Sequence, residues 1–221
     1  MIEVKTYPEP KLNRKEILRY AGCGKESGEM SALLDECLLE AYPELSYRVC
    51  FCEVPIRIEG ELVDFSVMQV KSKLLAQNLS GCERAVIFAA TVGVGIDRLV
   101  QKYSKISPSK ALIMQAIGAE RIESLCDMFE SDMKNSLIRK GLFTRPRFSP
   151  GYGDFHISKQ QDIFNILDCP RKIGLTLNES LIMSPSKSVT AVMGISKTSK
   201  NCDCGCEVCQ KTDCEFRREN R

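Results

Sequence analysis

The sequence predicts an α+β protein, and two observations carry this prediction. Segments with helical periodicity and segments with strand periodicity are interspersed along the chain, but they do not alternate regularly as repeated βαβ units would. Hydrophobic residues make up 43% of the 221 residues, which is enough for one sizeable core. We therefore expect a sheet flanked by helices in a body spanning residues 1–195, followed by an appendage at 196–221.

The first part of the body predicts two short helices and a strand. Apolar residues recur at helical spacing over 11–21 and 31–41, and Pro43 ends the second helix. The segment 47–58 is rich in β-branched and aromatic residues, which favours a strand, and Pro55 indicates that the strand lies at a sheet edge.

The middle of the chain predicts alternating short elements. A hairpin turn leads into a strand at 62–65, and a helix is expected at 70–79. A continuous apolar run at 84–91 indicates a buried strand, and a helix follows at 96–103. The intervening Gly93-Val94-Gly95 is better explained as a tight turn between packed elements than as a cradle for an anion.

The longest predicted element is a helix from Pro108 to about Lys140. Ser107 and Pro108 are typical of a helix start, with Ser as N-cap and Pro at the first helical position. One apolar stripe should face the core: Ile122, Leu125, Cys126, Phe129, Met133 and Leu137. A second stripe combines small and acidic residues: Ala116, Ala119, Glu120, Glu123 and Asp127.

The last part of the body predicts a loop, a helix and two strands. Prolines and glycines make 143–154 an ordered loop, and 158–167 has helical spacing. Two strands are expected at 173–183 and 187–195.

The composition of the loop suits capture of a flat, polar ligand. Arg147 offers a planar fork of donors for a carboxylate. Gly151 allows the backbone to approach a ligand closely, and Tyr152 supplies a ring that can pack on a base or sugar. On composition alone, a well-packed turn with an exposed arginine explains the same residues slightly better.

The motif Arg147-x-x-x-Gly151-Tyr152 resembles the S-adenosylmethionine-binding motif in the activation domain of cobalamin-dependent methionine synthase. The later Asn-Glu-Ser, Met-x-Pro and Ser-Val steps within 173–191 resemble that family's strand pair, and 86–93 with the long helix resembles its upstream strand and helix. The similarity covers roughly residues 80–195. The cysteine-rich end and the Gly-Tyr-Gly-Asp step resemble a stand-alone form of the domain.

The resemblance implies a curved, mostly antiparallel sheet flanked by helices, with the ligand in a surface groove; this is not a Rossmann fold, so Gly93-Val94-Gly95 is not expected to be a dinucleotide-binding loop. It also implies roles for particular residues. Arg147, Gly151 and Tyr152 lie on the binding motif, Ser149 matches a position whose backbone contacts the ligand, and Glu123 aligns with a glutamate that holds the ligand's amino group.

The function implied by the resemblance is reactivation of a separate methionine synthase. In that family, a methyl group passes from S-adenosylmethionine to cob(I)alamin carried by the partner, after an electron donor such as flavodoxin or ferredoxin has reduced the cobalt. The protein itself needs mainly to position the methyl group. Two alternatives stay open: reactivation of another corrinoid methyl-transfer protein, and a metal or iron–sulfur redox protein whose ligand site is silent.

Cysteine is unusually frequent, with twelve residues in two groups. Seven are scattered and are best explained as small, buried apolar residues. Five crowd into the end of the chain: Cys202, Cys204, Cys206, Cys209 and Cys214. Four thiolates suffice for a zinc ion or an iron–sulfur cluster, and thiol exchange is the alternative, so we expect a metal-binding tail at 196–221.

The charge balance is close to neutral, with 31 basic and 29 acidic residues. A net charge of +2 gives no general attraction to nucleic acid or to an anionic membrane. The first residues do not resemble a secretory signal, and no stretch approaches the roughly 18 apolar residues that span a bilayer. We expect a cytoplasmic protein that recognises its partners locally.

Overall fold

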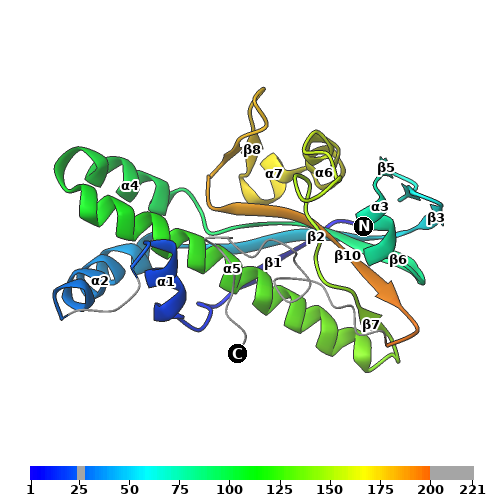
Figure 1. The fold of residues 1–221 in the computed structure, drawn as a ribbon, viewed down its shortest axis with the longest axis horizontal. Coiled ribbons are helices and arrows are strands. Elements are labelled where there is room, and N and C mark those ends of the chain that lie inside the picture. Colours follow the sequence, from blue (N-terminus) through cyan, green and yellow to red (C-terminus); the bar gives the residue numbers. More distant parts are fainter. Residues whose placement is uncertain (24–27, 200–221) are drawn as a thin grey trace.

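The computed structural model describes residues 1–23 and 28–199. Its centre is a curved five-stranded sheet in the order β1-β2-β6-β10-β7, in which all neighbouring strands are antiparallel. The strands are β1 (Glu3–Tyr7), β2 (Tyr47–Pro55), β6 (Cys82–Thr91), β7 (Phe143–Thr144) and β10 (Ser188–Ser196). The expected α+β class with a mostly antiparallel sheet is confirmed (Figure 1).

One face of the sheet packs against a helical layer dominated by the long helix. The layer contains α1 (Arg14–Tyr20), α2 (Gly28–Ala41), α4 (Gly95–Ile106) and α5 (Pro108–Ile138), and the short 3-10 helix η1 (Tyr42–Glu44) follows α2. The predicted apolar stripe of α5, from Ile122 to Leu137, lies in the core between this helix and the sheet. This stripe meets inward side chains of the strands such as Phe51 and Phe88, whose rings pack on Phe129.

The opposite face carries smaller elements. Its helices are α3 (Lys73–Asn78), α6 (Lys159–Leu167) and α7 (Cys169–Ile173). Two small sheets accompany them: β3 (Arg57–Glu59), β4 (Leu62–Asp64) and β5 (Gln69–Lys71), and the pair β8 (Thr176–Leu177) and β9 (Met183–Ser184). Because successive strand residues point to opposite faces, β2 sends Phe51 to the first core and Cys50 and Cys52 to the second.

Several sequence predictions need correction. The predicted edge strand at 47–58 is β2, which lies between β1 and β6, and Pro55 stands at its end where the chain turns into β3. The predicted strand at 173–183 is wrong, because the segment contains only β8 and the start of β9. The predicted helix at 70–79 begins only at Lys73, after β5. The predicted loop at 143–154 opens with β7.

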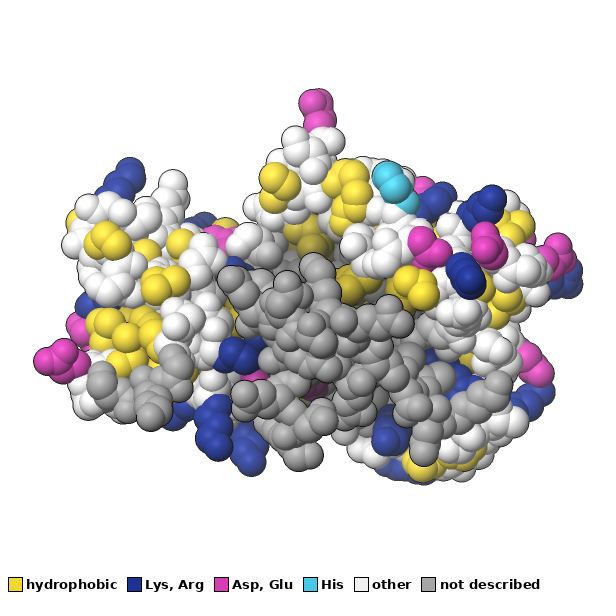
Figure 2. Space-filling model, viewed as in Figure 1, with side chains coloured by type: hydrophobic (Ala, Val, Ile, Leu, Met, Phe, Trp, Pro, Cys, Tyr) yellow, Lys and Arg dark blue, Asp and Glu magenta, His cyan; other side chains and the backbone are white. Residues whose placement is uncertain are grey.

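All seven scattered cysteines are free thiols, and the prediction that they are buried core residues is confirmed for six of them, whereas Cys23 is only half-buried. The helical pair α4–α5 extends past the sheet at the end of the molecule that also carries α2 (Figure 1). Hydrophobic side chains remain visible at that end (Figure 2), where Leu39 of α2 and Ile106 of α4 are exposed.

Within the described residues, no helix is both long and apolar enough to cross a bilayer.

Candidate functional site

The predicted binding loop starts as a continuation of the sheet edge. The Phe148 and Val192 backbones exchange two N–H···O bonds, each 2.9 Å long, beside β10. Because side chains alternate along this extended segment, those of Arg147 and Phe148 point to opposite faces of the sheet. Phe148 stacks on buried Phe155 in the second core, at 6.2 Å between ring centroids. Arg147 is left on the other face, where it reaches α5.

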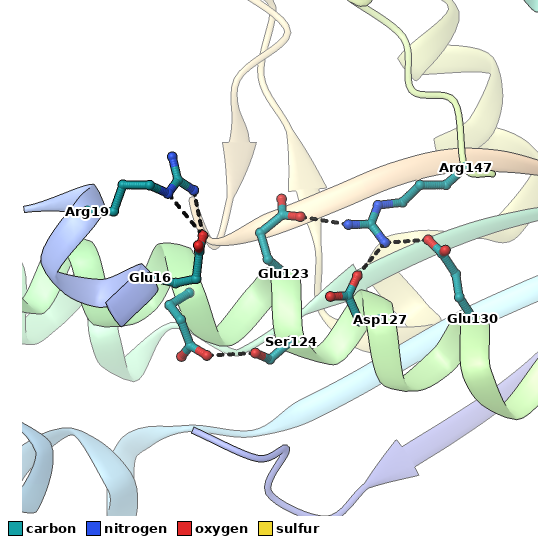
Figure 3. Close-up of polar contacts among 8 residues, drawn as sticks. Glu16, Arg19, Glu123, Ser124, Asp127, Glu130 and Arg147 are labelled. Carbon is teal, nitrogen blue, oxygen red and sulfur yellow. Dashed lines mark hydrogen bonds and ion pairs between the residues drawn. The ribbon is translucent and has the colours of Figure 1, made fainter. Parts of the chain in front are cut away.

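Arg147 makes ion pairs with three carboxylates of α5. One of its terminal nitrogens lies 2.7 Å from Glu123, and the other lies 2.9 Å from Asp127 and also bonds Glu130 (Figure 3). Spacings of three and four residues place these acids on one face of the helix. The structure therefore brings together Arg147 and Glu123, two of the residues that the sequence predicted for one site.

Electrostatics at this cluster are unbalanced toward negative charge. One guanidinium faces three carboxylates, so the formal charge of the four side chains is −2. Burial opposes the charge on Arg147, yet the adjacent Glu130 and Glu123 outweigh it and raise the pKa of the guanidinium. Burial raises the pKa of Glu130 as well, and Arg147 opposes that rise.

The other predicted residues form the turn that follows. Ser149 uses its backbone carbonyl to accept a 3.2 Å bond from the Tyr152 N–H. Gly151 has φ +94°, a conformation that L side chains rarely adopt, and its N–H donates to the Phe155 carbonyl at 2.7 Å. Tyr152 is 69% exposed, so its ring is not held in the core.

Two neighbouring features border the cluster. Figure 3 shows Glu16 and Arg19, an ion pair of α1 with a 2.6 Å contact, near Glu123 on α5. A groove of about 790 Å³ lies between the segment 7–13 and α5, and Asp127 is part of its lining. None of the five predicted binding residues lines this groove, so Asp127 is the link between it and Arg147.

Sequence reasoning did not select Asp127 or Glu130 as binding candidates. Asp127 stood on the small and acidic stripe, and Glu130 continues that stripe one turn further. The spacing Glu123, Asp127, Glu130 was the available signal, because it places three acids on one helix face.

The predicted metal ligands Cys202, Cys204, Cys206, Cys209 and Cys214 lie outside the described residues. Within residues 1–23 and 28–199, no group of three or more His, Cys, Asp or Glu side chains is arranged to hold a metal ion.

The sheet and its helical layer form an α+β domain whose fold recurs in a known structure. A crystal structure described as the MetH reactivation domain bound to AdoHcy has the same fold, with a TM-score of 0.65 and 15% sequence identity. The match covers 90% of this chain and 80% of that chain.

The sequence profile of the family "Vitamin B12 dependent methionine synthase, activation domain" matches residues 72–218. The chain belongs to this family, as its resemblance predicted, and the match includes α5, the Arg147 loop and most of the cysteine-rich segment. A comparison with curated proteins finds no match.

Proposed function

We propose that this chain binds S-adenosylmethionine at Arg147 and Glu123 and supports reductive methylation of the cobalamin of a separate methionine synthase. The observation that carries the proposal is the direct contact between the Arg147 guanidinium and the Glu123 carboxylate, across the interface of the loop and α5. Membership in the activation-domain family and the ligand named for the similar crystal structure support it.

An arginine beside a glutamate is complementary to the amino-acid end of S-adenosylmethionine. That end carries a carboxylate and an ammonium on one carbon. In this proposal the ligand's carboxylate replaces carboxylates of α5 at the planar fork of Arg147, and the ligand's ammonium takes an oxygen of Glu123. Arg147 and Glu123 are only partly exposed, at 20% and 32% of their side chains, so these bonds form with little competition from water.

The excess negative charge of the cluster favours a cationic ligand. S-adenosylmethionine carries a sulfonium and an ammonium against one carboxylate, whereas the demethylated product has no sulfonium. Asp127 and Glu130 add two further carboxylates near the ligand's amino-acid end. Attraction across a few ångströms at a partly buried site is worth on the order of 1 kcal/mol or more.

The turn after Arg147 completes the proposed site. The exposed ring of Tyr152 is free to lie against the nucleoside, and the backbone at Ser149 and Gly151 supplies the other contacts that we propose. We retain these three residues as proposed contacts.

The chemistry asks little of the protein beyond positioning. The sulfonium–methyl bond breaks while cob(I)alamin, the methyl acceptor on the partner, supplies the electron pair of the new cobalt–carbon bond. S-adenosylhomocysteine leaves with the former bonding pair on sulfur, and no proton is transferred. Arg147 and Glu123 hold one end of the ligand, and the methyl group is presented to the partner.

The partner and the electron source belong to the same proposal. A cobalamin protein must supply the acceptor, and we propose methionine synthase, with another corrinoid methyl-transfer protein as the alternative. An electron donor such as flavodoxin or ferredoxin would reduce the cobalt before methylation. Pull-down by the tagged full chain from mixtures of purified corrinoid proteins separates the two partners.

Calorimetric titration with S-adenosylmethionine tests the binding site. Arg147→Ala removes a charge-assisted bond worth about 1.5–3 kcal/mol, so we expect affinity to fall by about 10- to 100-fold. Arg147→Lys keeps the charge but loses the fork and should bind with intermediate affinity. Arg171→Ala is the matched control, since Arg171 is an exposed arginine that pairs only loosely with Asp168, at 3.8 Å.

Equal affinities for the wild-type chain and Arg147→Ala would refute the site. A wild-type chain that does not bind the ligand would refute the function and favour the redox protein with a silent ligand site.

A further inference from the structure

The conformation of the binding loop depends on how its far end is held. Its near end is fixed to β10 through Phe148 and Val192. Within the turn, the bonds from Tyr152 to Ser149 and from Gly151 to Phe155 fix local shape only. Because the Tyr152 ring is largely exposed, packing of the ring does not fix its position. Buried Phe155, stacked on Phe148, anchors the chain beyond the turn, and the exposed residues between these two rings are left for a further contact to orient.

The Asp154 carboxylate supplies an external contact. It accepts the Lys73 N–H at 2.7 Å and the Leu74 N–H at 3.3 Å, and it also bonds the Ser72 hydroxyl. Lys73 and Leu74 are the first residues of α3, and the first N–H groups of a helix have no partner within the helix. Asp154 therefore caps a helix that lies about eighty residues earlier in the chain.

The cap is shared between two side chains without conflict. Ser72, the N-cap residue, accepts the next free N–H, from Leu75 at 3.0 Å, while its hydroxyl hydrogen goes to Asp154. Ser72 is buried, and Leu75 and Ala76 of α3 lie in the second core. Because α3 is packed in the core, the bonds of Asp154 fix the loop to a well-anchored helix.

Gly153 allows this close approach. A Cβ at Gly153 would lie 2.4 Å from the Leu74 Cδ1, and the residue has φ +54°. A side chain at this φ is strained, and it would also have to displace the end of the Leu74 side chain.

We propose that Asp154, with Gly153, is a positioning residue that holds the ligand-binding turn by capping α3. This inference rests on the proposed function for its consequence in binding. It assigns α3 and its neighbours on the second face a part in ligand affinity, although neither Asp154 nor Leu74 needs to touch the ligand.

The test measures loop order and ligand affinity on the full chain. In Asp154→Ala we expect amide hydrogen exchange of residues 149–155, without ligand, to accelerate by about tenfold or more. Affinity for S-adenosylmethionine should fall by about tenfold because the turn is no longer pre-organised. Asp154→Asn keeps one carbonyl acceptor and should give smaller changes in both measurements.

Asp64→Ala is the matched control. Asp64 is a half-buried aspartate that also caps a turn, accepting from the Ser66 N–H at 2.7 Å and from Gln69 at 3.0 Å. It lies in the small sheet, and its replacement should leave loop exchange and ligand affinity unchanged.

A double variant tests the contact itself. Gly153→Ala should loosen the turn and weaken binding, and adding Leu74→Ala should recover part of the loss because it removes the clashing methyl group. The positive φ remains unfavourable for alanine, so recovery should be incomplete.

The outcomes separate the two proposals. Unchanged loop exchange in Asp154→Ala would overturn the positioning role whatever the ligand does, and so would accelerated exchange with wild-type affinity. A wild-type chain that fails to bind S-adenosylmethionine, together with accelerated exchange in Asp154→Ala, would refute the proposed function while supporting the contact between the loop and α3.

Discussion

At the scale of single residues, the charges around Arg147 decide what the site can hold. Glu123, Asp127 and Glu130 project from one face of α5 toward one guanidinium. Asp127 is the most exposed of the three acids, at 59% of its side chain, and it also lines the groove beside α5. Replacing Asp127 with a neutral residue therefore changes the charge of the site with little effect on packing.

Asp127→Asn should lower the preference for S-adenosylmethionine over S-adenosylhomocysteine. The variant removes one negative charge near the sulfonium, which only the first ligand carries. Titration of both ligands measures the ratio, and raising salt from about 50 to 500 mM should shrink the wild-type preference by screening. A ratio that neither the variant nor the salt alters would show that the acids do not sense the sulfonium.

Lys187 is a second residue whose charge matters, because its burial disfavours the charged form. Its Cγ and Cε lie 2.8 and 3.1 Å from where a Cβ of Gly118 would be, so its stem runs over a glycine of α5. Burial lowers the pKa of Lys187, and the nearby Asp97 only partly opposes this. Since the folded pKa is below the unfolded one, the charged form weakens the fold at neutral pH.

Lys187→Met should stabilise the protein at neutral pH, because methionine keeps the buried stem and removes the charge. The gain should shrink as the pH approaches 10.5, the ordinary lysine value, where the unfolded chain also loses the proton. Thermal unfolding of both proteins across this range measures it. A stability gain that stays constant with pH would mean that packing, not ionisation, is responsible.

At the scale of elements, a buried ion pair joins the N-terminal segment to α5. Glu120 and Arg121 are 2% and 0% exposed and contact each other at 2.5 Å. Arg121 donates to the carbonyls of Pro10 and Lys11, and Glu120 accepts the Asn13 N–H. The segment before α1 is thus held against α5, where it forms one wall of the groove.

Glu120→Gln should destabilise the protein by about 3–5 kcal/mol, because it leaves the buried Arg121 charge without its carboxylate. Urea unfolding monitored by circular dichroism measures the change. Glu83→Gln breaks an exposed pair with Lys197, whose side chains are about 70% accessible, and should cost under about 1 kcal/mol. Similar losses in the two variants would argue against a structural role for the buried pair.

At the scale of the whole molecule, we propose separate roles for the body, which binds the ligand, and for the cysteine-rich tail, which binds a metal. The sheet with its two cores ends at Ser196, and the predicted division at 195 falls beside this point. The family profile nevertheless continues to residue 218, so the tail belongs to the matched region. Our proposal that residues 196–221 bind a metal concerns this region.

The chain purified without oxygen should contain zinc or an iron–sulfur cluster. Visible absorbance separates the two, and elemental analysis gives the amount per chain. Cys206→Ser with Cys209→Ser should abolish the metal, since a tetrahedral site needs four ligands and three cysteines would remain in the tail. Full metal content in this double variant, or a metal-free wild-type chain, would contradict the proposal.

Local patterns determined much of the fold from the sequence alone. The stripe of α5 was predicted because its apolar residues repeat at helical spacing, and β6 was predicted because a short, continuous apolar run before a glycine turn is typical of a buried strand. The strand β1 was not predicted, since its residues are mostly exposed and show no alternation; it forms by backbone pairing with β2. The segment 173–183 was wrongly predicted to be one strand. Its apolar residues belong to short, irregular pieces of chain that pack against α6 and the sheet.

The sequence by itself determined the family, the candidate pair Glu123 and Arg147, and the turn at Gly151. Only the tertiary structure decided that Asp127 and Glu130 share the same guanidinium and that Asp154 caps α3. Motifs report residues that lie close along the chain or repeat with a helical period. Contacts between segments about eighty residues apart depend on how the sheet brings its edges and helices together, which no local spacing encodes.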